Sequence, residues 1–352
     1  MNTIITEPDN TPEENRAMDD VEIMLDEALA RAGAVAWGVA RSMPVAEREM
    51  QGWRRWIAEG RNAGMEYMER HEWLRMDPEG LLPGCGSVVS VAFNYTPAQG
   101  RDMRLPRVAS FAYGMDYHDV LRKRLSEAVE GLRSVSGGEW RICIDSAPVF
   151  ERYWAQKCGV GTRADNGLIY VRPYGTRILL AEILTTLELS PYSRTLAPGK
   201  AGQEAPPCQQ EATYRDRAPE ACIHCGACRR VCPAGALQED STVDARRCLS
   251  YLTVEHRDAW DAAGEEAMRT PAGRRTLFGC DLCQDVCPLN RLAIPTRLAE
   301  FSPIPIIASG ALTRTEALGM NREDFSKAFR GSPVKRAKLA GLRRNAGNLD
   351  PT

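Results

Sequence analysis

Cysteine spacing is the strongest chemical signal in this sequence. Eight of its twelve cysteines lie between residues 222 and 287. The run 222–233 has the spacing C-x2-C-x2-C-x3-C-P, which is typical of bacterial ferredoxins. The run 280–288 reads C-x2-C-x3-C-P, and Cys248 stands between the two runs. Eight thiolates are the number that two [4Fe–4S] clusters require, so the sequence predicts two such clusters.

The spacing also predicts which cysteines share a cluster. In ferredoxin runs the fourth cysteine, next to proline, binds the cluster that the first three do not. The expected ligands of cluster 1 are Cys222, Cys225, Cys228 and Cys287, and those of cluster 2 are Cys232, Cys248, Cys280 and Cys283. Structural zinc is the alternative because C-x2-C pairs also bind zinc, but two Cys-Pro closings at this spacing favour iron. Disulfides are disfavoured in a large chain whose first residues do not resemble a secretory signal.

Asp145 is the leading candidate for acid–base chemistry. It stands where a predicted strand, residues 140–145, meets a predicted helix, residues 147–157. Proteins of the α/β class often bind ligands at such strand ends. Partial burial could raise the pKa of this carboxyl toward neutrality and allow it to donate a proton. The alternative, which the residue types alone favour, is that Asp145 caps the helix that follows.

Hydrophobic periodicity predicts alternating helices and strands before the cysteine runs. We expect helices over 21–33, 47–59, 117–135 and 147–157, and strands over 34–40, 86–95, 140–145 and 167–171. The apolar run 178–189 fits either a strand or a helix. This alternation predicts an α/β sheet.

The same patterns divide the chain into five parts. Residues 1–18 are expected to be a flexible tail, residues 19–190 an α/β domain, and the proline-rich residues 191–220 a surface linker. Residues 221–292 are expected to form a bacterial-ferredoxin-like module with two clusters, and residues 293–352 a short, basic, helical C-terminal region.

Composition restricts the class of protein. The 352 residues are 43% hydrophobic and 26% charged, with a net charge of −2, which is ordinary for a soluble globular protein. A nucleic-acid partner would therefore need a local basic patch. The run from Arg330 to Arg344 could provide one, or could be a solvated helical face. No apolar run reaches the roughly 18 residues of a membrane span, and the polar N-terminus does not read as an export signal, so a cytoplasmic location is expected.

Several segments together resemble the epoxyqueuosine reductase family, the cobalamin-dependent iron–sulfur enzymes of tRNA queuosine synthesis. The likeness extends over roughly residues 20–345 and includes all eight cysteines discussed above. The other segments that carry it are 81–95, 113–118, 145–152, 157–161, 182–189, 244–255 and 329–336. This combination is far more specific than the ferredoxin spacing alone.

The resemblance implies a mechanism. In this family cobalamin lies between the α/β domain, which binds the corrinoid, and the clusters, which reduce its cobalt. The epoxide of a modified base in the tRNA anticodon loop then loses its oxygen as water, which requires two electrons and protons. The family's proton donor matches Asp145. A single-stranded loop is also the kind of RNA that proteins can open and read.

Position in the family pattern further suggests binding residues. The expected cobalamin contacts are Arg70, Tyr113, Asp145, Ile169, Leu180 and Ser250. The tRNA contacts are expected from charge and place in the chain instead, and they are His256, Arg257, Lys335, Arg336 and Lys338. A solvated helix end also explains the first two, and a solvated helical face the other three. The implied partners are a tRNA carrying epoxyqueuosine and an electron donor such as a ferredoxin or flavodoxin. The chain is expected to act as a monomer without a membrane partner.

The chain departs from the family pattern beside the expected corrin site. After Gly161 the family usually continues Trp-x-Gly-Lys-Asn, whereas this chain has Thr-Arg-Ala-Asp165-Asn166, so an acid replaces the lysine. His224, inside the first cysteine run, is expected to adjust hydrogen bonding or solvent access at cluster 1 rather than to bind iron. His118 could touch cofactor or substrate, or could simply pack.

Two other functions stay open on the sequence alone. One is a corrinoid reductase that resembles reductive dehalogenases, which the Asp145 motif and the absence of a twin-arginine pair disfavour. The other is a non-enzymatic iron–sulfur protein that transfers electrons or reactivates a corrinoid.

Overall fold

A five-stranded antiparallel sheet is the centre of the N-terminal half. The computed structural model describes the backbone of residues 12–196 and 220–351, and side chains from residue 20 onward. The strand pairings of this sheet are all antiparallel. In sheet order the strands are β4 (Trp140–Cys143), β7 (Ile178–Thr185), β2 (Ser87–Asn94), β1 (Ala36–Arg41) and β8 (Tyr192–Thr195).

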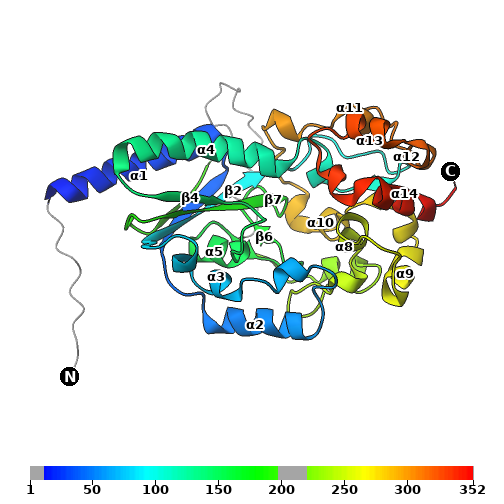
Figure 1. Cartoon of the computed structure of the whole chain (residues 1–352), viewed down its shortest axis with the longest axis horizontal. Coiled ribbons are helices and arrows are strands. Elements are labelled where there is room, and N and C mark those ends of the chain that lie inside the picture. Colours follow the sequence, from blue (N-terminus) through cyan, green and yellow to red (C-terminus); the bar gives the residue numbers. More distant parts are fainter. Residues whose placement is uncertain (1–11, 197–219, 352) are drawn as a thin grey trace.

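Helices cover both faces of the sheet (Figure 1). One face carries α1 (Pro12–Ala32) and α4 (Tyr117–Ser136). The other carries α2 (Glu47–Ala58), α3 (Glu72–Met76) and α5 (Glu151–Lys157), with the short turns η1 (Glu66–Met68) and η2 (Pro78–Gly80).

The central strand β2 shows why this layering forms. Side chains alternate between the faces of a strand, so Val89, Val91 and Phe93 enter the core beneath α1 and α4. Val88 and Ala92 enter the second core, which α5 covers. All residues of β2 are buried as a result, which is why its sequence reads as a continuous apolar run.

The segment with the cysteine runs consists of short elements. They are α7 (Ala227–Val231), η4 (Ala245–Arg247), α8 (Leu249–Val254), α9 (Ala262–Arg269), η5 (Gly273–Arg275), β9 (Thr276–Phe278), α10 (Leu282–Asp285) and η6 (Pro288–Asn290). Strand β9 pairs in parallel with β3 (Arg107–Val108), which comes from the N-terminal half. The two halves of the chain therefore share one small sheet.

Helices and turns also form the C-terminal region, as expected. They are η7 (Ala299–Phe301), α11 (Pro305–Ala308), α12 (Arg314–Gly319), α13 (Arg322–Ala328), η8 (Pro333–Ala337) and α14 (Lys338–Asn348). Their apolar side chains, including Phe329 and Leu342, share a core with β9 and with η3 (Ser110–Ala112).

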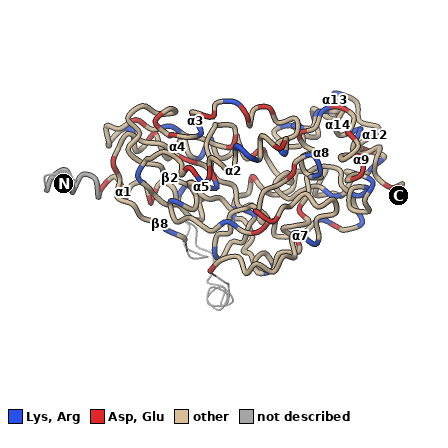
Figure 2. The backbone as a smooth tube through the Cα atoms, turned by 90° about the horizontal axis from the view of Figure 1, so that it is seen from below, with Lys and Arg blue, Asp and Glu red and all other residues tan. Residues whose placement is uncertain are grey.

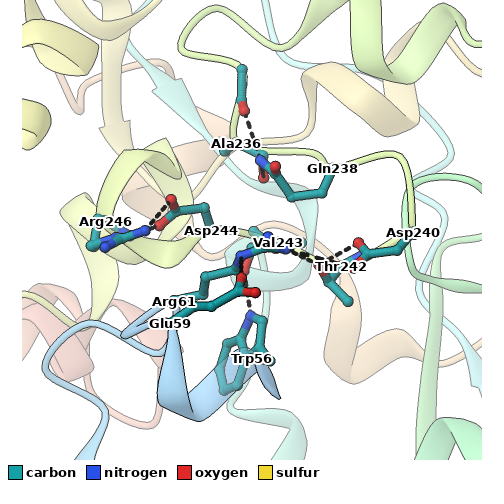
Figure 3. A network of polar contacts seen from close by, with 11 residues as sticks. Trp56, Glu59, Arg61, Ala236, Gln238, Asp240, Thr242, Val243, Asp244 and Arg246 are labelled. Carbon is teal, nitrogen blue, oxygen red and sulfur yellow. Dashed lines mark hydrogen bonds and ion pairs between the residues drawn. The ribbon is translucent and has the colours of Figure 1, made fainter. Parts of the chain in front are cut away.

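Polar contacts join the cysteine segment to the residues around α2 (Figure 3). The indole nitrogen of Trp56 donates to the carbonyl of Val243 at 2.7 Å, and Nη1 of Arg61 donates to Oγ1 of Thr242 at 3.0 Å. On the sheet side, Nη2 of Arg177 lies 2.5 Å from Oδ1 of Asp285. The cysteine segment is thus held from two sides.

The structure corrects several sequence expectations. Residues 12–18 belong to α1, so the expected tail of residues 1–18 is too long, and residues 1–11 lie outside the described residues. The expected linker of residues 191–220 contains the edge strand β8, because Tyr192–Thr195 pairs with β1; residues 197–219 lie outside the described part.

Other expectations concern the sheet itself. The strands expected over 34–40, 86–95 and 140–145 and the helices expected over 47–59 and 117–135 are confirmed within a few residues. The ambiguous run 178–189 is the strand β7, and the segment 167–171 contributes only Ile169–Tyr170 (β6), which pairs with Thr162–Arg163 (β5). Alternation of helices and strands predicted an α/β sheet; helices do cover it, but its strands run antiparallel.

The surface does not divide into an acidic and a basic half. Basic and acidic residues are interspersed along the chain (Figure 2). In the described part of the chain, no helix combines the length and the apolar character that crossing a membrane demands.

Candidate active site

Four cysteines surround one hollow at the edge of the cysteine segment. Its volume is about 310 Å³, and its lining includes Cys222, Cys225, Cys228 and Cys287. These are the residues expected to bind cluster 1. Burial is the main cause that raises the pKa of Cys287, and the neighbouring thiols of Cys222 and Cys225 raise it further. The cysteines of the two runs are therefore close to one another. Thiolates that converge from several directions suit a cubane cluster.

The other four cysteines also lie together. Burial and then the charge of Cys232 raise the pKa of Cys248, and burial followed by the thiols of Cys280 and Cys248 raises that of Cys283. The backbone N–H of Ala236 donates to Sγ of Cys232 at 3.2 Å. This is the kind of hydrogen bond that adjusts the potential of a bound cluster.

His224 in the first cysteine run contacts the α/β part of the chain. Its Nδ1 lies 2.7 Å from Oδ1 of Asp165, in the turn between β5 and β6. Asp165 also lines the hollow formed by the first four cysteines. The acid that replaces the family's lysine is therefore next to the expected cluster 1.

Asp145 lies beyond the end of β4, in a turn with left-handed backbone geometry (φ 48°). Two groups at the start of α4 hold its carboxylate: Oη of Tyr117 donates to Oδ2 at 2.7 Å, and Nε2 of His118 lies 3.0 Å from the same oxygen. The other ring nitrogen of His118, Nδ1, lies 2.8 Å from Oδ1 of Asp116. The Asp145 side chain keeps 54% of its surface exposed.

These contacts shift the pKa values of Asp145 and His118 in opposite directions. Crowding by protein atoms would raise the pKa of Asp145, but the hydrogen bonds from His118 and Tyr117 outweigh it and lower that pKa. Burial likewise opposes a charge on His118, but its hydrogen bonds to Asp116 and Asp145 raise its pKa to about 9. The expectation that burial raises the pKa of Asp145 is wrong, because a cationic partner is in direct contact.

Glu151 completes this group of charges. Its Oε1 accepts a hydrogen bond from the backbone N–H of Asp145 at 2.6 Å. Burial and then the negative charge of Asp145 raise the pKa of Glu151 to about 8. The helix α5 begins at Glu151, and the carboxylate of Asp145 points to Tyr117 and His118 instead of the first turn of that helix. The interpretation of Asp145 as a helix cap is therefore wrong.

Basic residues of the C-terminal region reach the same place. Arg336 forms a bidentate ion pair with Glu255, with both N–O distances 2.8 Å, and its charge helps to lower the pKa of Asp145. Tyr67 lies beside this pair: burial and the charges of Glu255 and Asp145 raise its pKa to about 12. Asp145, Arg336, Glu255 and Tyr67 thus come together from four separate parts of the sequence.

The residues expected to contact tRNA lie close to one another. The guanidinium of Arg257 donates to the carbonyl of Arg336, and Nε2 of His256 lies 3.0 Å from the carbonyl of Ala259. Lys335 lies in η8, and Lys338 begins α14 with an exposed side chain. The charge of Arg336 is paired with the carboxylate of Glu255.

The residues expected to contact cobalamin are distributed over several parts of the fold. Ile169 and Leu180 belong to the core beneath α5. Tyr113 is buried in the core of the C-terminal helices. Arg70 is exposed and pairs with Glu66 at 3.0 Å, and Ser250 is half-buried in α8.

Apolar surface is available beside Asp145. The strand β7 is buried except for its first three residues, Ile178 to Leu180, which are half-buried. Cys143 of β4 pairs with Glu182 of β7, so the same register continued by two residues brings Asp145 level with Leu180. The end of β7 that lies nearest to Asp145 is therefore apolar and partly exposed.

Sequence reasoning missed Tyr67, Glu255 and Glu151 as parts of the site. Tyr67 lies outside the segments that carry the family resemblance, and although Glu255 ends one of them, only the folded chain brings η1 and the end of α8 to Asp145. Glu151 and His118 were visible in the segments that carried the family resemblance. That both groups hold their protons beside Asp145 could not be inferred without the folded structure.

Comparisons with known proteins agree with this arrangement. A family model described as "4Fe-4S double cluster binding domain" matches residues 221–290, and one described as "Epoxyqueuosine reductase QueG, DUF1730" matches residues 75–146. The epoxyqueuosine reductase of Cyclobacterium marinum is 33% identical over 85% of this chain and 87% of its own length. That of Salmonella typhimurium is 36% identical over 80% of this chain and 67% of its own length.

Solved structures give the same fold. An epoxyqueuosine reductase in complex with an epoxyqueuosine-modified tRNA-Tyr stem loop is similar with a TM-score of 0.76 and 24% identity, over 94% of this chain and 80% of that one. The enzyme from Streptococcus thermophilus gives a TM-score of 0.75 at 23% identity, over 93% of this chain and 80% of that one.

Proposed function

Because the chain belongs to the epoxyqueuosine reductase family, we propose that it reduces epoxyqueuosine to queuosine in the anticodon loop of tRNA. The observation that carries this proposal is the likeness to family members at 33–36% identity over most of the chain. Its local support is the position of Asp145, half-exposed at the end of the sheet and bordered by Arg336. We further propose that the protein acts in the cytoplasm and as a monomer.

The iron–sulfur part of the proposal assigns all eight cysteines. Cys222, Cys225, Cys228 and Cys287 hold cluster 1, and Cys232, Cys248, Cys280 and Cys283 hold cluster 2. The grouping of the thiols in the structure supports this assignment. A one-electron donor protein such as a ferredoxin or flavodoxin would reduce the clusters.

Cobalamin would be held at the uncovered end of the sheet. Leu180 would contact it from the apolar side, next to Asp145, while Ile169 belongs to the buried core against which Leu180 packs. When bound, cobalamin supplies a low-valent cobalt that can pass electrons to the epoxide. The protein would contribute the apolar residues at the start of β7 and, through Asp145, a proton.

Asp145 would donate that proton to the substrate. Its carboxylate is exposed enough to reach a substrate, and it is the acidic group that borders both the apolar surface and the basic residues. Since its hydrogen bonds lower its pKa, it rests in the ionised form and must receive a proton before it can give one.

The test is an anoxic assay with the protein carrying both clusters and cobalamin. It is supplied with a strong reductant and tRNA bearing epoxyqueuosine, and the nucleosides are identified by mass spectrometry. Conversion to queuosine by the native chain, and its loss in Asp145→Ala with cofactors still bound, would support the proposal. No conversion at full cofactor loading would refute it.

A further inference from the structure

The reaction consumes more protons than Asp145 can hold. Reductive loss of the epoxide oxygen breaks two C–O bonds, forms one C=C bond and releases water, so it takes up two electrons and two protons. The electrons come from the one-electron donor named above, and both protons end on the oxygen. This inference rests on the proposed function, and asks which group delivers protons to an aspartate that is ionised at rest.

His118 is placed for this task. Its Nε2 is 3.0 Å from Oδ2 of Asp145, and its Nδ1 is 2.8 Å from Oδ1 of Asp116. Since each ring nitrogen faces a carboxylate oxygen, both nitrogens carry hydrogen and the ring is an imidazolium. Tyr117 stacks on the ring with a centroid distance of 4.1 Å and an interplanar angle of 26°, which fixes the direction of the Nε2–H bond.

We propose that His118 is the proton source for Asp145. The Nε2 proton passes to Oδ2 of Asp145, whose carboxyl then protonates the oxygen that leaves the substrate. Asp116 stays ionised and holds the ring in place. The proton-bearing form of His118 predominates at neutral pH, because its hydrogen bonds to Asp116 and Asp145 raise its pKa to about 9 in spite of burial.

The neighbouring groups are less suited to this role. Burial strongly raises the pKa of Tyr117, so this phenol keeps its proton. Glu151 faces the backbone N–H of Asp145, not its carboxylate. Arg336 is engaged by Glu255. The groups around His118 are thus Asp116 and Tyr117 from α4, Asp145 and Glu151 from the β4–α5 connection, and Arg336 from η8 at longer range.

His118 can be protonated again after it has given up its proton. The His118 side chain is 31% exposed, so water can return a proton to the ring after each transfer. Two passages along the same path supply the two protons of one turnover. The rate of the proton-dependent step should therefore follow the protonated fraction of His118.

Single-turnover conversion by the reduced holoenzyme, measured from pH 6 to pH 10, tests the proposal. Wild type should lose rate as pH rises through the pKa of His118, about 9. The variant His118→Gln keeps a neutral donor of similar size but cannot be charged. It should be about 100-fold slower at neutral pH, as loss of a general acid implies, and its rate should no longer fall at alkaline pH.

The smaller variant His118→Ala provides a second readout. Added imidazole should restore part of its rate, most strongly at pH values where imidazole is protonated. Absorbance of the clusters and the corrin, and tRNA binding, should equal those of wild type in both variants. A His118→Gln enzyme with the wild-type rate, or a slow one that retains the alkaline decline, would overturn the proposal. Failure of wild type itself to convert the substrate would instead refute the proposed function.

Discussion

Oδ1 of Asp165 lies 2.7 Å from Nδ1 of His224, and this hydrogen bond joins the β5–β6 turn to the loop of the first cysteine run. The Asp165 side chain is largely buried (14% exposed), whereas that of His224 is 75% exposed. His224 also has left-handed backbone geometry (φ 50°). The contact therefore holds an otherwise exposed and unfavourable loop conformation against the α/β part.

Removal of this contact should loosen cluster 1 selectively. In Asp165→Ala the cysteine loop loses its attachment, so we expect iron from cluster 1 to be removed faster by a chelator, by a few-fold. The rate is followed by the loss of cluster absorbance, and electron paramagnetic resonance distinguishes the two clusters. Cluster 2 is the internal control, and equal acceleration at both clusters would contradict this local explanation.

The acid behind His118 should set the pH at which activity declines. In Asp116→Asn the hydrogen bond to Nδ1 loses its charge, which lowers the pKa of His118 from about 9. The alkaline decline of the single-turnover rate should then move to lower pH. Asp119→Asn is the matched control, because Asp119 is an exposed acid on the same helical turn. An unchanged profile in Asp116→Asn would count against the imidazolium.

The buried carboxyl of Glu182 should make the fold less stable as pH rises. Its Oε1 accepts from Ser90 at 3.1 Å, while Oε2 has no partner among the described residues. Burial and then Glu151 raise its pKa well above the usual value. The unfolded chain therefore releases this proton at lower pH than the folded chain, so stability falls above roughly pH 4.5.

Glu182→Gln tests this effect directly. The variant lacks the titrating proton, so its melting temperature should decline less than that of wild type between pH 5 and pH 8. Glu188→Gln, which alters an exposed acid three residues beyond β7, serves as control. Parallel declines in wild type and Glu182→Gln would show that this carboxyl does not titrate in the folded protein.

The two lysines next to Arg336 should account for part of tRNA affinity. The double variant Lys335→Gln, Lys338→Gln removes two charges that can neutralise phosphates. Binding should weaken at all salt concentrations, and the slope of log affinity against log salt should become shallower by about 1 to 2. Lys327→Gln, an exposed cation of α13, is the control. An unchanged slope in the double variant would place the phosphate contacts elsewhere.

Local sequence patterns predicted much of this fold. The 117–135 helix and the 86–95 strand have strong periodicity and appear nearly as expected. The antiparallel order of the sheet could not be predicted, because strand pairing depends on contacts such as Cys143 with Glu182 that join distant residues. Strand β8 was missed because Tyr192–Thr195 lies among prolines and polar residues at the sheet edge.

The sequence predicted some residues of the site, but neither all of them nor the direction of their pKa shifts. Cysteine spacing is a local property that a cluster dictates, so the eight cysteines could be named from the sequence. Asp145 could be named too, from its position after a strand and from family resemblance. The direction of its pKa shift was wrong, since it depends on His118 and Tyr117, which only the packing of α4 against the sheet brings into contact.

The parallel pairing of β3 with β9 has a consequence for how the protein matures. Residues 107–108 and 276–278 must meet before this small sheet exists, and closing so large a loop is entropically costly and slow. Cys280 follows the end of β9 after a single residue, Gly279. The pocket for cluster 2 is therefore completed late in folding, so the machinery that inserts iron would meet a nearly finished protein and not a detachable ferredoxin.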